Sequence, residues 1–156
     1  MERATARATA LRILAFESHE RRTSHEVAAH VERVLAHVYR ALSEWVGQAG
    51  SHALFVRAIT LATPEHPVLV GVLHREGTSP HLAQLAENAG VQGTNATIAA
   101  ATTVLTTIIA TLSGLIGEDI ALSLLDNVTA PSTGARDVSR GAVTTAPQSN
   151  HGNDAS

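Results

Sequence analysis

Residues 93–116, GTNATIAAATTVLTTIIATLSGLI, decide the fold of this 156-residue chain. Apolar residues recur in this stretch at alternating spacings of three and four, which is the spacing of one helix face. They are Ile98, Ala101, Leu105, Ile108, Leu112 and Leu115, with Val104, Ile109 and Ile116 beside them. The polar side chains fall on the other side and are Thr103, Thr106, Thr107 and Ser113. We therefore expect a central hydrophobic helix over about 94–116, whose solvent face carries hydroxyls and no charges.

The same stretch raises the question of a membrane, because no ionisable side chain occurs between Glu87 and Glu118. About 20 apolar residues suffice to cross a bilayer. Asn95, the many threonines and the absence of a flanking Lys or Arg cluster or aromatic belt oppose insertion. We favour a core helix in water and keep membrane association through 94–116 as a lesser alternative.

Composition indicates one domain with a core built from small and aliphatic side chains. The chain is 44% hydrophobic but only 3% aromatic, and its formal net charge is −3. A charge of this sign disfavours nucleic-acid binding. The absence of cysteine excludes disulfides, thiolate metal sites and a cysteine nucleophile. We find no secretory signal near the N-terminus and expect a cytoplasmic protein.

Several helices should pack around the central one. Thr23 to Glu26 forms a capping-box pattern, so a helix should begin there and end at Gly47. Its predicted buried face is Val27, Val31, Val34, Val38, Leu42 and Trp45. Ser51 is the expected cap of the next helix, which Pro64 ends. A further helix is expected from Ser79 and Pro80 to Gly90, and a last one over 119–127 with Ile120, Leu124 and Leu125 on its buried side.

The remaining segments lack a helical pattern of this strength. Residues 68–73, VLVGVL, resemble a strand without a partner, so we expect an extended connection over the helices, with a small hairpin as the less favoured alternative. An N-terminal arm, residues 1–22, holds a marginal helix with Ala4, Ala8, Leu11 and Ala15 on its apolar side, and its docking is left open. Residues 23–127 form the all-α bundle domain. Residues 128–156 lack Leu, Ile and aromatic side chains and should be disordered.

The nine histidines do not form an evident metal site. His30 and His37 share a helix stripe, but about 10 Å of helix rise and Arg33 separate them, so one ion cannot be held by both. A composite site of His66, His74 and His81 stays open, since these lie in connections. No Gly-x-Ser-x-Gly elbow and no phosphate loop occurs. We therefore expect no cofactor and no metal.

The segment Ala36-His37-Val38-Tyr39-Arg40-Ala41, followed by Gly47, resembles the phosphoacceptor segment of histidine phosphotransfer domains. The resemblance implies a helical bundle in which His37 accepts phosphate and Arg40 assists. Leu42 stands where that family prefers a small residue.

A second resemblance covers more of the chain. The segments Gly47-Gln48-Ala49-Gly50, Glu65-His66-Pro67 and Leu115-Ile116-Gly117-Glu118-Asp119 are similar in order to those of small all-helical bacterial proteins whose activity is uncharacterised. This resemblance implies a helical fold and no activity.

The sequence thus favours a non-enzymatic helical module that works through protein contacts. The partner is a different protein or a second copy of the chain, and the Thr face is the expected self-association surface. A plainly hydrated Thr face is the equal alternative, and histidine phosphotransfer on His37 is the alternative function.

Overall fold

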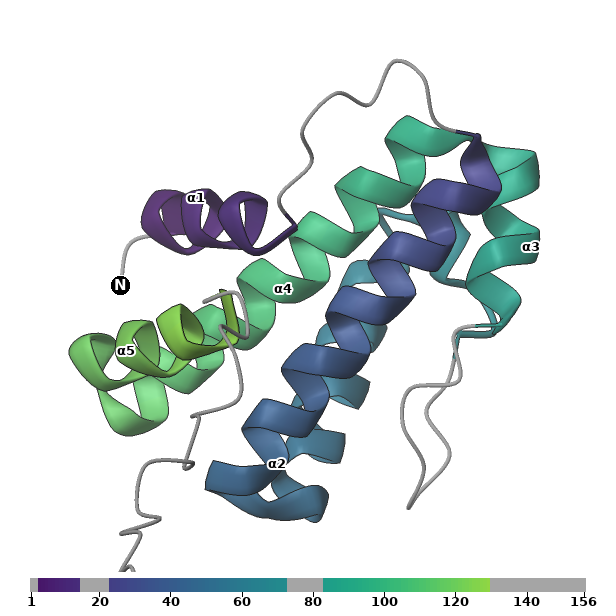
Figure 1. Ribbon diagram of the computed structural model, residues 1–156. Helices are drawn as coiled ribbons and strands as arrows, with labels where there is room; N and C mark the ends of the chain where they lie inside the picture. Colours follow the sequence, from purple (N-terminus) through teal and green to yellow (C-terminus); the bar gives the residue numbers. More distant parts are fainter. Residues whose placement is uncertain (1–2, 15–22, 73–82, 130–156) are drawn as a thin grey trace, which may run out of the picture.

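The computed structural model describes residues 3–14, 23–72 and 83–129, and over these residues the chain is helical without a strand (Figure 1). The elements are α1 (Arg3–Leu14), α2 (Ser24–Ala62), the short 3-10 helix η2 (Pro67–Leu69), α3 (Ala83–Gln92), α4 (Thr94–Ile116) and α5 (Glu118–Thr129). The predicted all-α bundle around a helix near 94–116 is confirmed.

Helix α4 is the centre of the bundle, because α1, α2, α3 and α5 all contact it. Leu105, Ile109 and Leu112 are fully buried. Burying one such side chain stabilises the fold by about 1.5–3 kcal/mol before the entropy of ordering is counted. Two glycines with positive φ, Gly93 at 88° and Gly117 at 93°, flank the helix and turn the chain away from its axis.

Helix α2 is a hairpin whose two halves meet at Gly47. The backbone there has φ 75° and ψ 166°, outside the helical region. The rings of Tyr39 and Phe55 lie 5.4 Å apart, whereas sixteen residues of straight helix would separate them by about 24 Å. The stop predicted at Gly47 is therefore confirmed. The cap predicted at Ser51 is wrong, because helix resumes directly after Gly47 and the buried Ser51 hydroxyl has no hydrogen-bond partner among the described residues.

The start of α2 has the predicted capping box. The Glu26 amide donates to the Thr23 hydroxyl over 3.3 Å, and the Thr23 amide donates to the Glu26 carboxylate over 2.7 Å. Val27, Val31 and Leu42 are buried as expected, but Trp45 is 64% exposed. Trp45 lies two residues before the reversal at Gly47, at the end of the hairpin, where the other helices cover it only in part.

The connection after α2 is more compact than predicted. Instead of an extended segment, residues 67–69 form η2, and Val68, Leu69 and Val72 are buried. The side-chain amide of Asn88 on α3 donates to the carbonyls of Val68 (2.9 Å) and Val70 (2.8 Å). These two bonds satisfy backbone groups that a lone strand would have left unpaired. The helix start predicted at Ser79 and Pro80 lies outside the described residues.

Helix α1 packs on α4, which settles the docking left open above, but its predicted apolar face is wrong. The buried residues are Ala6, Thr9, Ala10, Ile13 and Leu14. Ala4, Ala8 and Leu11 are exposed, and Ala15 is outside the described residues. The two large side chains Ile13 and Leu14 determine the orientation, since they remove far more apolar surface from water than alanines do.

Two contacts hold the C-terminal end of α1. His30 Nε2 lies 2.9 Å from the Leu14 carbonyl oxygen, and Arg12 pairs with Asp126 of α5 over 2.6 Å. The Leu14 carbonyl is one of the helix-end acceptors that the helix itself cannot satisfy. The pairing of Arg12 with Asp126 joins the first and last described helices.

Helix α5 buries Ala121, Leu124 and Leu125. Ile120, predicted to be buried with the leucines, is 55% exposed, and Leu115 near the end of α4 is 70% exposed. The single turn at Gly117 leaves both side chains at the outer corner between α4 and α5. The predicted disordered segment, 128–156, lies outside the described residues from residue 130 onward.

Candidate functional site

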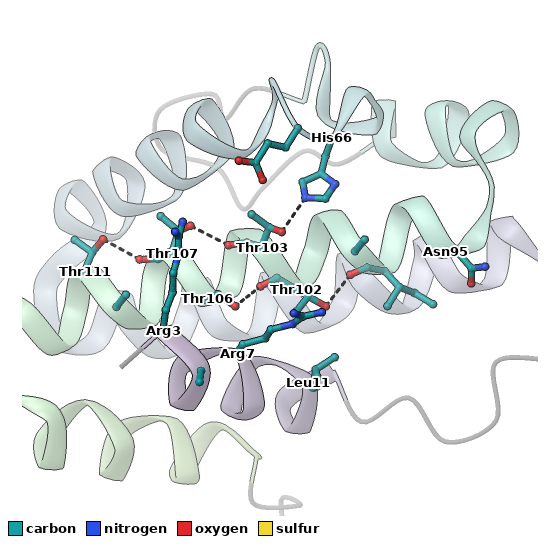
Figure 2. A pocket seen from close by; sticks show the side chains of 15 residues that line it. Arg3, Arg7, Leu11, His66, Asn95, Thr102, Thr103, Thr106, Thr107 and Thr111 are labelled. Carbon is teal, nitrogen blue, oxygen red and sulfur yellow. Dashed lines mark hydrogen bonds between the residues drawn. The ribbon is translucent and has the colours of Figure 1, made fainter. Parts of the chain in front are cut away.

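A groove of about 820 Å³ runs along the threonine side of α4 (Figure 2). Helix α4 forms its floor, α1 forms one wall, and the corner after α2 forms the other. Its lining residues are Arg3, Ala4, Arg7, Leu11, Glu65, His66, Asn95, Ile98, Ala99, Thr102, Thr103, Thr106, Thr107, Ala110 and Thr111. From Asn95 to Thr111 the floor extends over about 24 Å of helix rise.

Most hydroxyl groups on the floor already donate a hydrogen bond to the backbone of α4. Four threonines donate to the carbonyl one turn earlier: Thr102 to Ile98 (2.8 Å), Thr106 to Thr102 (2.7 Å), Thr107 to Thr103 (2.9 Å) and Thr111 to Thr107 (2.8 Å). These bonds direct the hydroxyls toward the helix backbone and leave methyl groups on the surface. The threonine face is also less exposed than predicted, because α1 lies beside it and Thr102 and Thr106 are buried.

Thr103 has a different partner. Its hydroxyl lies 2.8 Å from Nε2 of His66, which belongs to the corner between α2 and η2. Figure 2 shows the imidazole reaching down from this corner to the middle of α4. Either the ring N–H donates to the hydroxyl or the hydroxyl donates to the ring, according to the tautomer. This bond fixes one wall of the groove to its floor.

The charges of the groove lie on its walls. Arg3 and Arg7 are exposed on α1, one helical turn apart, and extend from it over the floor (Figure 2). Neither forms an ion pair with a residue that the structure describes, whereas Arg12 of the same helix pairs with Asp126. Glu65 on the opposite wall carries the negative charge. The groove therefore has a cationic wall, an uncharged floor and one carboxylate facing the cations.

The histidines considered above as possible metal ligands lie apart in the described part of the chain. His30 lies against the Leu14 carbonyl and His66 against Thr103. His74 and His81 fall outside the described residues, so the composite site with His66 stays a prediction. Within residues 3–14, 23–72 and 83–129, no three His, Asp or Glu side chains come together in a geometry that could hold a metal ion.

The proposed phosphoacceptor lies elsewhere. His37 and Arg40 are both exposed on the first half of α2, and neither lines the groove. Exposure on a helix is what phosphoryl transfer to an imidazole needs, so His37 stays a predicted phosphoacceptor with Arg40 beside it.

A smaller surface hollow of about 220 Å³ lies between α2 and α5. Trp45 of α2 and Ile120 of α5, both exposed, line it together with Asp119, Ser123 and Leu124. Both large side chains were predicted to be core residues. The signal that could have found this surface is their position next to the two chain reversals, at Gly47 and Gly117.

Among the described residues, α4 is the helix that is long and apolar enough to cross a membrane, and half of its most apolar window is buried inside the bundle. The sequence pattern indicated Thr103, Thr106 and Thr107 of the groove but not Arg3, Arg7 and Glu65, which are distant from them along the chain. No family model, curated protein or solved structure matches the chain.

Proposed function

We propose that this protein is a non-enzymatic interaction module that binds a segment of a protein partner in the α4 groove. The observation that carries the proposal is the floor of the groove, which is uncharged over about 24 Å and in which four of the five lining threonines donate within the helix. A polar group costs free energy on burial when it loses water without gaining a partner. The threonine hydroxyls already have partners, so a protein surface can cover them at little cost.

The length of the groove supports a protein segment as its occupant. A helix with side chains is about 10–12 Å across and rises 1.5 Å per residue, so about sixteen residues match the length of the floor. Ala99, Thr103 and Ala110 are small, which permits the backbone of a guest helix to come close to α4. Recognition of one helix in a groove is a recurrent mode of peptide binding.

The site chemistry supports binding over catalysis. In the described part of the groove, the Thr103 hydroxyl lies 2.8 Å from the His66 ring. No described carboxylate or carbonyl bonds the other ring nitrogen, as a nucleophile–base set with its orienting group would require. Two cationic side chains without ion-pair partners among the described residues, Arg3 and Arg7, are features of a recognition surface.

The test captures partners from the cells that carry the gene. It compares the amounts captured by the wild type and by two variants, Ala99→Trp and Val91→Trp. Ala99→Trp places a large ring on the exposed floor of the groove. Val91→Trp places the same ring on α3, where Val91 is 85% exposed and does not line the groove. The expected result is a set of partners that the wild type and Val91→Trp retain and that Ala99→Trp loses.

Thermal unfolding of the three forms gives the control for folding. The proposal is wrong if Ala99→Trp folds like the wild type and captures the same proteins in the same amounts. Light scattering over a range of concentrations identifies a second copy of the chain among the partners, since a groove-mediated dimer would dissociate in Ala99→Trp alone.

Histidine phosphotransfer on His37 is the second candidate, and the exposure of His37 and Arg40 on one side of α2 supports it. Incubation with a panel of phosphorylated receiver domains separates the two functions. Label that reaches the wild type and not His37→Gln would establish phosphotransfer, whereas a wild type that takes no label from the panel would reject it.

A further inference from the structure

We infer that the occupant of the α4 groove is a single acidic α-helix of a different protein, an inference that rests on the proposed function and specifies its partner. Two properties of the groove lead to it: the unmatched charge of its α1 wall and the spacing of that charge.

The charge of the α1 wall has no counterpart within the described bundle. Arg3 and Arg7 form no ion pair there, while Glu65 supplies one carboxylate on the far wall against two guanidiniums. An arginine is charged at every physiological pH and has five N–H donors arranged for carboxylates. A guest with carboxylates on the side that faces α1 would pair with both arginines.

The spacing of the two arginines favours a helix as the source of those carboxylates. Arg3 and Arg7 are four residues apart, about 6 Å along α1. Glu or Asp side chains four residues apart on a guest helix repeat at the same interval. An antiparallel or parallel guest lying beside α1 therefore offers one carboxylate to each arginine. Its opposite edge, which faces Glu65, should be neutral or basic.

The contact surface of the guest should be narrow and made of small or apolar residues. Leu11 of α1 is 48% exposed at the edge of the groove, and Ile98 lies on the floor. These two side chains offer apolar contacts near the Asn95 end of the groove. The threonine methyl groups continue the floor toward Thr111.

A second copy of the chain does not fit this recess well. Each described helix of a copy is already packed in its own bundle, so none of them can enter the groove as a separate helix. Residues 130–156 lack the required charge, because Arg136 and Arg140 balance Asp137 and Asp154. We therefore assign the complementary helix to another protein.

The test uses the full chain and three fluorescent helical peptides of about eighteen residues, which are about 27 Å long. All three share an alanine- and leucine-bearing face. The first has Glu at positions four apart along one edge, the second has Gln at those positions, and the third has Lys. Fluorescence anisotropy at low ionic strength should give the tightest binding for the Glu peptide and the weakest for the Lys peptide, and added salt should reduce the difference.

Charge reversal in the chain identifies the arginines. Arg3→Glu and Arg7→Glu should each weaken binding of the Glu peptide by about 2- to 5-fold, within the range of an exposed ion pair, and should strengthen binding of the Lys peptide. Arg33→Glu is the matched control, because Arg33 is exposed on α2 and does not line the groove. Arg33→Glu changes the net charge by the same amount as Arg3→Glu or Arg7→Glu. It should leave the order of the three peptide affinities unaltered.

Failure of this inference can be distinguished from failure of the proposed function. Equal binding of the Glu and Gln peptides, lost in Ala99→Trp, would overturn the acidic partner and leave the groove as a protein-binding site. A dimer that Ala99→Trp abolishes would replace the acidic helix by a second copy. Binding to vesicles of anionic lipid that requires Arg3 and Arg7, without binding of any peptide, would overturn the inference in favour of a membrane surface. Capture that is insensitive to Ala99→Trp would overturn both.

Discussion

The two sides of α4 are both free of charge, but for different physical reasons. The side toward α2 carries Leu105, Ile108 and Leu112, which are at most 1% exposed, and burial excludes charges there. The groove side carries threonines, several of them half-exposed, where solvent would permit charges. On this second side the charges stand on the neighbouring walls, at Arg3, Arg7 and Glu65. Lack of charge therefore indicates a core on one side and, in our interpretation, a contact surface on the other.

The largest expected effect tests the core side. Ile108→Ala should lower the free energy of unfolding by about 2–5 kcal/mol, because it removes buried methylenes and leaves a cavity. Thr107→Ala, one residue earlier on the groove side, should change it by less than about 1 kcal/mol, since alanine is the better helix former. Urea denaturation measures both values. Equal losses would show that the two sides of α4 do not differ in packing.

The next effect tests how closely α1 approaches α4. Ala10 is fully buried on α1, so Ala10→Leu should cost about 1–3 kcal/mol through overpacking. Ala8→Leu adds the same side chain two residues earlier at an exposed position and should leave stability nearly unchanged. Thermal unfolding of the pair also tests which face of α1 is buried. A greater loss for Ala8→Leu would support the face first expected from the sequence.

A smaller effect is expected within the groove. Thr103→Val removes the hydroxyl that bonds His66 and should cost about 0.5–1.5 kcal/mol. Thr107→Val is its matched control, because that hydroxyl bonds a carbonyl within α4, whose helical partner remains. Denaturant unfolding should place the control within about 0.5 kcal/mol of the wild type. If the two variants are alike, the contact with His66 does not hold the corner to the floor.

The smallest effect compares two arginines of α1. Arg12→Gln breaks an exposed pair with Asp126 and should cost no more than about 1 kcal/mol. Arg7→Gln should leave the free energy of unfolding within about 0.5 kcal/mol of the wild type, since no described residue pairs with Arg7. Added salt should reduce the stability loss of Arg12→Gln and leave the unfolding free energy of Arg7→Gln relative to the wild type unchanged. A stability loss larger for Arg7 would indicate that its charge serves folding instead of recognition.

Local patterns predicted the elements well where one side chain or one spacing determines the outcome. The capping box at Thr23, the reversal at Gly47 and the limits of α4 are all properties of short segments. The predictions failed where burial depends on distant elements. Ile120 and Trp45 follow the helical period of their own segments, yet both lie next to chain reversals and stay more than half exposed.

The sequence by itself determined that this protein is helical and that 94–116 is its central helix, because periodicity and glycine conformation act over a few residues. Only the tertiary structure decided which face of α1 is buried and that Arg3, Arg7, Glu65 and His66 stand beside the threonines of α4. The physical reason is that a groove is formed by surfaces far apart in the chain. Which surfaces meet depends on how several apolar faces are buried together.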